Sequence, residues 1–204
     1  MAVANIETKA KTEEKTEGVT EGMTWEYYME TPMSGRFEII EGVFYQRPTP
    51  TMRYQIYVMN IALAIYEYER KLCNGVVVFA PCDILIRRFP RLQTRQPDVL
   101  FTSNEQLARG RGVPERGPLL IGPELVVEII SDSETEQSVN DKISDYIFIG
   151  VRESWKVFPA SRTVEVVRLT QDGAESVATY DKTQSAASIT FDGLTVSIAA
   201  IFAA

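Results

Sequence analysis

The sequence predicts an α/β (α+β) fold with a mixed central β-sheet flanked by helices. Two observations carry this prediction. Apolar runs typical of strands alternate along the chain with segments of helical periodicity. The run at 124–130 is apolar apart from two glutamates, as expected of a strand that is buried on both faces. With 204 residues, 45% of them hydrophobic, the chain is long enough to bury a core.

The domain organisation follows from composition. Residues 1–22 hold five glutamates and three lysines but few large apolar side chains, so burial cannot offset the entropy of ordering them. They lack the apolar centre of a signal peptide, and no run in the chain reaches transmembrane length. We therefore expect a disordered tail at 1–22, a single domain at 23–204 and no membrane contact.

The N-terminal elements begin with a short helix at 24–29, followed by two short strands or one bent strand within 36–45. A long helix is expected at 52–72, because apolar residues recur there at three- and four-residue spacing, and Asn-Gly at 74–75 ends it. The recurring apolar residues are Ile56, Met59, Leu63 and Tyr66.

The middle of the chain predicts strands at 76–86, 97–101 and 124–130, and then a helix at 134–149. Within that helix, Lys142 and Tyr146 are four residues apart and share one face, beside a more apolar stripe. The C-terminal part predicts strands at 154–158 and 163–169, weaker strands at 177–180 and 194–198, and a helical turn at 199–204.

The chain contains no histidine, which excludes histidine-based catalytic triads, histidine general bases and histidine-ligated metal centres. The only cysteines, Cys73 and Cys82, are too few for a structural zinc site and show no disulfide framework. We therefore expect a reduced, cytoplasmic protein whose chemistry depends on carboxylates, lysine and a metal ion.

The formal net charge of −7 means that bulk charge cannot bind nucleic acid, so any such binding needs a local patch. One candidate is the arginine-rich chain around the strand at 97–101, which carries a local charge of +4 between residues 87 and 116. We expect its arginines to contact phosphates, unless they only decorate an exposed loop. Those nearest the strand are Arg87, Arg88, Arg91 and Arg95.

Two acidic residues could form a catalytic pair. Asp98 opens one predicted strand and Glu128 lies inside another, among apolar neighbours where an unpaired carboxylate would cost several kcal/mol. Two carboxylates on neighbouring strands repel each other unless a proton or a divalent cation lies between them. Mg²⁺ suits such a site because it keeps waters for phosphate chemistry. Alternatively, Asp98 caps a turn and Glu128 pairs with a buried arginine.

Several short motifs in this order resemble the Uma-type restriction-endonuclease family, a branch of the PD-(D/E)XK nuclease superfamily. The resemblance spans about residue 24 to the C-terminus and rests on the order of the motifs rather than on any one of them. The motifs are E-x-I-x-G at 38–42, P-x-P at 48–50, A-P-x-D at 80–83, Q-P-D-V-L-F at 96–101, P-E-L-V-V-E-I-I-S at 123–131, D-K-x-x-x-Y at 141–146 and G-V-x-E-x-W at 150–155.

The resemblance implies a restriction-endonuclease-like core that hydrolyses phosphodiester bonds, with Mg²⁺ or Mn²⁺ and with DNA as the expected substrate. It assigns Asp98 and Glu128 as metal ligands, and Glu38 as a third carboxylate that binds the metal directly or through water. Lys142 would orient or deprotonate the attacking water and offset negative charge in the transition state. If the three carboxylates converge, they repel one another without metal, and neutralising one, as in Asp98→Asn, is expected to be neutral or stabilising.

The sequence departs from the superfamily's (D/E)XK element at Ile130, as the family as a whole does, and from the family pattern at Tyr54, Ser154 and Asp132. Ile130 stands where the (D/E)XK element has its lysine, and the resemblance implies that Lys142 of the following helix replaces it. Tyr54 stands where the family often has a histidine. Asp83 matches a recurring aspartate that either faces the site or makes a strand-end turn contact. Without the family pattern, Lys142 would be interpreted as a solvated helix lysine.

Three functions remain open from the sequence. The first is a divalent-metal-dependent endonuclease, and the second is a catalytically silent nucleic-acid-binding or scaffolding homodimer on the same fold. The third is a two-carboxylate glycosidase, which would need aromatic sugar platforms and would give Lys142 no role. By analogy with such families, we also expect a homodimer, which would allow both strands of a duplex to be cut.

Overall fold

The structure is a computed structural model that describes residues 22–33, 35–131 and 134–203. Its larger sheet is mixed, with six strands in the order β10-β9-β8-β7-β6-β3. Only β7 and β8 run parallel, and the other neighbours are antiparallel. The strands are β3 (Gly75–Phe79), β6 (Val99–Ser103), β7 (Leu125–Ile129), β8 (Glu153–Phe158), β9 (Thr163–Thr170) and β10 (Gly173–Tyr180).

Two helices cover opposite faces of this sheet. Helix α2 (Met52–Leu72) packs on one face, where Ile61 and Ile65 are fully buried against the strands. Helix α4 (Glu136–Phe148) packs on the other face through Ile143 and Tyr146. A C-terminal unit lies against α2 and consists of β11 (Ser185–Ala187), β12 (Thr195–Ser197) and α5 (Ile198–Ile201). The predicted mixed sheet flanked by helices is therefore confirmed.

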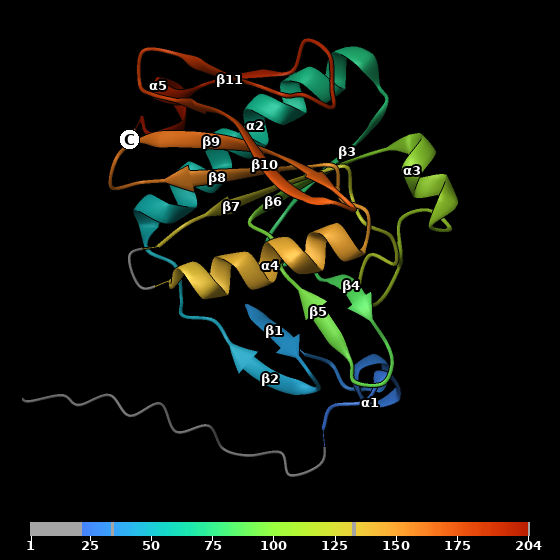
Figure 1. Ribbon diagram of the computed structural model, residues 1–204. Coiled ribbons are helices and arrows are strands. Elements are labelled where there is room, and N and C mark those ends of the chain that lie inside the picture. Colours follow the sequence, from blue (N-terminus) through green and yellow to red (C-terminus); the bar gives the residue numbers. More distant parts are fainter. Residues whose placement is uncertain (1–21, 34, 132–133, 204) are drawn as a thin grey trace, which may run out of the picture.

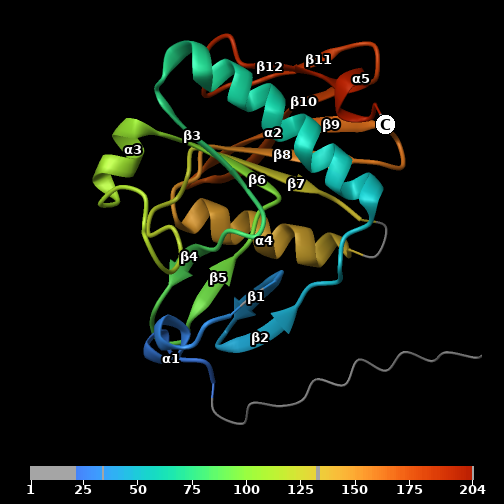
Figure 2. The same cartoon turned by 180° about the vertical axis from the view of Figure 1, so that it is seen from behind.

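A second, antiparallel sheet has the strand order β2-β1-β5-β4. Helix α4 lies between this sheet and the larger one in both views (Figures 1 and 2). Helix α1 (Trp25–Glu30) closes the far side of the smaller sheet in a core of its own. The strands are β1 (Phe37–Ile40), β2 (Val43–Gln46), β4 (Ile84–Arg87) and β5 (Gln93–Arg95).

The segment predicted as one strand at 76–86 is two strands, β3 and β4, which belong to different sheets. Pro81 lies between them, and because proline has no N–H to donate, it interrupts the ladder. The arginine-rich stretch that follows is not only a loop, since all three residues of β5 are buried. Helix α3 (Asn104–Arg109), which begins after the N-cap Ser103, was not predicted.

The long helix α2 ends at Leu72, as predicted, and Cys73, which directly precedes Asn-Gly, adopts the left-handed conformation with φ of 49°. The apolar spacing that predicted this helix lies mainly on its solvent side. Met59 and Leu63 are about half exposed. A different set of residues forms the side of the helix that packs on the sheet. That buried set is Tyr57, Val58, Ile61, Ala62 and Ile65.

The predicted tail at 1–22 and the single domain at 23–204 stay predictions. Residues 1–21 lie outside the described residues, as do 34, 132–133 and 204. The described chain begins at Gly22, beside the β1–β2 turn, where the Met23 N–H donates to the Gly42 carbonyl at 2.6 Å.

Candidate active site

Asp98 and Glu128 lie opposite each other at the ends of neighbouring strands. The antiparallel register pairs Val99 with Val127, so Asp98, which directly precedes β6, faces Glu128 of β7. Both side chains are buried. Residues opposite each other on such strands are close enough to interact, so the sheet itself creates the predicted carboxylate pair.

The Asp98 carboxylate accepts three hydrogen bonds from three different elements. Its Oδ1 accepts from Arg36 Nη2 at 2.6 Å and from the Tyr54 hydroxyl, and its Oδ2 accepts from the Ile129 backbone N–H at 2.7 Å. Arg36 directly precedes β1, and Tyr54 lies in the first turn of α2. Tyr54, which the sequence analysis matched to a histidine position, therefore touches the candidate catalytic aspartate. Burial and the neighbouring Asp98 charge raise the pKa of Tyr54, so its phenol is a donor at neutral pH.

Helix α4 supplies the partners of Glu128. Lys142 Nζ donates to Glu128 Oε2 at 2.8 Å, and the Tyr146 hydroxyl donates to Oε1. Both donors project from one face of α4 because they are four residues apart. Burial and repulsion from Asp98 raise the pKa of Glu128, although Lys142 opposes this shift. Lys142 is thus buried on the carboxylate and is no solvated helix lysine.

The Lys142 ammonium also joins Glu128 to Glu134, with its Nζ at 2.8 Å from Glu134 Oε1. Burial alone would lower the pKa of Lys142, but the surrounding carboxylates, led by Glu128, outweigh burial and raise it. Burial would raise the pKa of Glu134, yet Lys142, the Ser131 N–H and Arg47 lower it to about 2. The surrounding carboxylates therefore favour the protonated ammonium, which donates to both Glu128 and Glu134. Glu134, which the sequence analysis missed, is ionised.

Glu38 is buried on β1 and is neutralised by arginines. Its Oε2 lies 3.3 Å from Arg95 Nη1 and 3.9 Å from Arg47 Nη1. Arg95 in turn donates from Nε to Asp145 Oδ2 of α4 at 2.6 Å. Within the described residues, no group of three or more acidic or cysteine side chains is placed to hold a metal ion. Asp98 and Glu128 face each other, and Glu38, whose direct partners are arginines, lies near enough to add to the rise that burial causes in the pKa of Glu128. Its assignment as the third carboxylate of the site stays a prediction.

The four arginines predicted as one phosphate-binding patch are separated. Arg87 pairs with Glu41, and the Arg88 guanidinium lies 4.1 Å from the centre of the Trp25 ring. Together with Arg91, they lie near the β1–β2 turn, at the opposite end of β1 from Arg36. Arg95 is buried within the site. Its position corrects the expectation of an exposed contact for that residue.

A different set of arginines lines an open cleft of about 350 Å³ beside Asp98. They are Arg36, Arg47 and Arg53, and Tyr54 and Glu134 line the same cleft. The sequence analysis missed them because they are spread over 18 residues that span a hairpin and a helix start. Pro48 and Pro50 were the available signal, since they end the hairpin and direct the chain into α2 beside the site.

Asp83 makes a structural contact rather than joining the carboxylate pair. Its Oδ2 accepts from the Tyr28 hydroxyl at 2.5 Å and its Oδ1 accepts from Gln96 Nε2 at 2.8 Å. Burial raises the pKa of Asp83, although both hydrogen bonds oppose the shift. Asp83 thereby ties α1 to the chain that leads into Asp98.

Comparisons with known proteins show the family of this chain. The family model described as Uma2, putative restriction endonuclease, matches residues 25–199. This chain belongs to the Uma2 family. The family predicted from the order of the motifs is therefore confirmed. The comparison with curated proteins found no match.

The Uma2 chain is also similar to a solved structure, described as a putative nuclease belonging to DUF820 from Anabaena variabilis ATCC 29413. The two share 20% sequence identity with a TM-score of 0.69, over 88% of this chain and 97% of that chain. This likeness concerns the fold. None of the described helices is long and apolar enough to span a bilayer.

The donor set of the Uma2 site suits a hard divalent cation in its chemistry, because carboxylate oxygens are the ligands that Mg²⁺ and Mn²⁺ prefer. Among the described residues of the network, five carboxylates face four cationic side chains, which leaves one formal negative charge. The acids are Glu38, Asp98, Glu128, Glu134 and Asp145, and the bases are Arg36, Arg47, Arg95 and Lys142.

Proposed function

We propose that this Uma2 protein is a divalent-metal-dependent endonuclease that hydrolyses phosphodiester bonds in DNA at the Asp98–Glu128 pair. The observation that carries the proposal is the position of this pair. Two buried carboxylates face each other at the ends of adjacent strands, and the cleft beside Asp98 is lined by three arginines. Such a cleft favours a polyanion over a neutral sugar.

Asp98 and Glu128 would hold Mg²⁺ or Mn²⁺, with Glu38 acting through water, because arginines already occupy it. A bound divalent ion polarises a phosphate oxygen and lowers the pKa of a bound water. The cationic side chains bind and orient the substrate. Arg53 is exposed at the start of α2, and Arg36 and Arg47 flank the β1–β2 hairpin. All three line the same cleft, so a backbone phosphate bound there would contact them.

Lys142 would stabilise charge rather than remove a proton. Its raised pKa keeps the ammonium protonated, so it donates hydrogen bonds and offsets negative charge that develops on the phosphate. The Tyr146 hydroxyl donates to the other oxygen of the Glu128 carboxylate and keeps that carboxylate oriented. Of the two roles considered for Lys142 from the sequence, the proposal takes the first, in which the protonated ammonium orients the attacking water.

The test is cleavage of supercoiled plasmid DNA by the full chain with Mg²⁺, with Mn²⁺ and with chelator. Asp98→Asn and Glu128→Gln should each lower the metal-dependent rate at least about 100-fold, since each removes charge that holds the metal. The matched control is Glu105→Gln, which changes an exposed carboxylate on α3 and should leave the rate unchanged. Equal rates for Asp98→Asn and wild type would contradict the proposal.

One observation favours a second candidate, a catalytically silent DNA-binding protein on the same fold. Both carboxylates of the pair already accept hydrogen bonds from the protein: Arg36 donates to Asp98, and Lys142 donates to Glu128. If those ion pairs persist, no metal enters. Calorimetric titration with Mn²⁺ separates the candidates, because the endonuclease binds the ion and loses that binding in Asp98→Asn. Retained DNA binding without Mn²⁺ binding or cleavage would establish the silent protein.

A further inference from the structure

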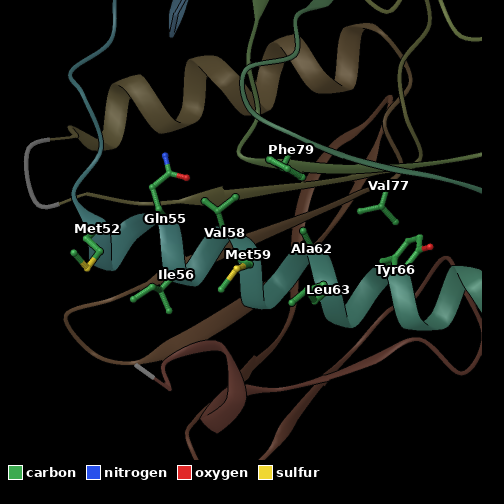
Figure 3. Close-up of a pocket in the computed structure, with 10 residues that line it drawn as sticks. All are labelled: Met52, Gln55, Ile56, Val58, Met59, Ala62, Leu63, Tyr66, Val77 and Phe79. Atoms are coloured by element: carbon green, nitrogen blue, oxygen red, sulfur yellow. The ribbon is translucent and has the colours of Figure 1, made fainter.

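The outer side of α2 and the edge strand β3 form an apolar groove that the described chain leaves open. The groove has a volume of about 530 Å³. Figure 3 shows its side chains projecting from α2, with Val77 and Phe79 contributed by β3. Met52 is 80% exposed and Phe79 57% exposed. Continuous apolar surface of this kind marks an interaction site on most soluble proteins.

The exposed stripe on α2 is centred on Met59. Its members are spaced by four, three, four and three residues, and Met59 is the central one. They are Met52, Ile56, Met59, Leu63 and Tyr66. When two such helices lie antiparallel around a two-fold axis at Met59, Met52 of one faces Tyr66 of the other, because both are seven residues from Met59. Ile56 lies within one residue of the level of Leu63. A two-fold interface requires this self-complementarity, because the same patch must serve both copies.

The edge of the larger sheet lies in the same place. Strand β3 (GVVVF) ends the strand order and pairs only with β6 among the described strands. An apolar edge strand that nothing covers invites association, and proteins usually cover such an edge. A partner in the groove would cover the α2 side of β3.

The apolar area available matches that of a dimer. Five of the groove side chains, namely Met52, Met59, Leu63, Tyr66 and Phe79, are about half exposed or more. At roughly 200 Å² per large side chain, they offer about 500 Å² of apolar surface per copy. A stable interface buries roughly 800 Å² per partner, of which about 65% is apolar in homodimers. That share is about 500 Å².

We propose that this groove is the interface with a second copy of the chain, with the two α2 helices antiparallel and Met59 at the two-fold axis. The N-terminal segment is a poorer occupant, because residues 1–21 contain no aromatic residue and several charges. The described chain also begins beside Gly42, in the smaller sheet. The interface does not depend on the proposed nuclease activity, since it lies on a different surface.

The pairing brings the two candidate active sites close together. Tyr54 lies five residues before Met59 on α2, so the two copies of Tyr54 would be separated by about 15 Å along the helix axes, at 1.5 Å per residue. The two arginine-lined clefts would then open on either side of the two-fold axis, about 15 Å apart along the helices. A duplex could reach both.

The experiment measures the mass of the full chain by sedimentation equilibrium over a range of concentrations. Wild type should be a dimer, and Met59→Glu should raise its dissociation constant about 100-fold or more, because two carboxylates would meet at the axis. The control is Phe148→Glu, which changes a helix residue that is 68% exposed outside the groove and should leave the dimer intact. Unchanged melting of both variants shows that they are folded.

Disulfide cross-linking tests the register independently. In a Cys73→Ser background, Met59→Cys should yield a covalent dimer under mild oxidation. Leu72→Cys, on the exposed side of the same helix, should not, because its two copies would be about 39 Å apart along the axes. A monomeric wild type, or a dimer that persists in Met59→Glu without cross-linking at residue 59, would overturn the proposal. A monomer that co-floats with phosphatidylcholine vesicles would assign the groove to a lipid surface instead.

Discussion

Each carboxylate of the candidate pair has hydrogen-bond donors from the protein, which offset the repulsion between the two. Asp98 has Arg36, Tyr54 and the Ile129 N–H, and Glu128 has Lys142 and Tyr146. The sequence alone suggested that neutralising one carboxylate would relieve repulsion. The structure reverses that expectation, because removing one charge would leave a buried cation or donor without its partner.

Asp98→Asn should therefore destabilise the metal-free protein by about 2–3 kcal/mol. The new amide NH₂ would have to face either the Ile129 N–H or the Arg36 and Tyr54 donors, and Arg36 would lose its countercharge. Urea unfolding in the presence of chelator measures this, with Asp172→Asn on an exposed turn as the control. A mutant as stable as wild type would show that repulsion within the pair dominates.

Glu134 should make the protein lose stability in acid. Its folded pKa of about 2 lies below the ordinary value, so its contribution is complete above about pH 4.3 and is lost as the pH falls towards about 2. That contribution is about 3 kcal/mol at most. Compared with Glu134→Gln, wild type should be more stable at neutral pH, and the difference should shrink below about pH 4.3. A difference that stays constant with pH would exclude the ion pair with Lys142 as its source.

Among the elements, α2 has three separate surfaces. One side packs on the larger sheet, the first turn contributes Arg53 and Tyr54 to the cleft, and the outer side forms the groove. The arrangement explains why the sequence indicated the helix correctly from residues that lie outside the core. An apolar stripe at helical spacing identifies a helix, but it does not say whether the chain itself or another chain buries that stripe.

Arg53 should contribute to DNA binding, whereas Arg88 should not. Arg53 is exposed in the cleft and has no ion pair among the described residues. Arg53→Ala should weaken binding to all sequences and reduce the slope of log affinity against log salt by about one. Arg88→Ala, at the Trp25 ring on the far side of the smaller sheet, is the matched control. Fluorescence anisotropy over a salt series measures DNA binding by both variants. A larger loss of affinity in Arg88→Ala than in Arg53→Ala would assign the phosphate contact to the arginine-rich stretch instead.

At the scale of the whole molecule, α4 connects the two sheets. One face of the helix reaches Glu128 on the larger sheet through Lys142 and Tyr146. Asp145 binds the smaller sheet, where its Oδ2 accepts from Gln93 Nε2 and Arg95 Nε, both at 2.6 Å. The site is assembled only when both sheets are docked on this helix, because Glu38 comes from one sheet and Glu128 from the other.

Asp145→Ala should loosen the smaller sheet and destabilise the protein by about 2–3 kcal/mol, since the buried Arg95 would lose its half-buried partner on α4. Hydrogen exchange of Ile39 and Val127 amides reports the two sheets separately. If residues 23–204 are one domain, both amides exchange through the same opening in wild type. The control Asp141→Ala changes an exposed aspartate of the same helix. Independent opening of the sheets in wild type would contradict the single domain.

The sequence by itself determined the family, the mixed sheet with its helices, and the identity of Asp98, Glu128 and Lys142 as residues that meet. Local spacing, cap residues and an ordered series of motifs carry that information. Only the tertiary structure decided the charge partners. Arg36, Arg47, Tyr54 and Glu134 come from separate segments, and the burial of Arg95 depends on how two sheets dock on α4. Electrostatic pairing is set by distances between segments far apart in the chain, and no local pattern records those distances.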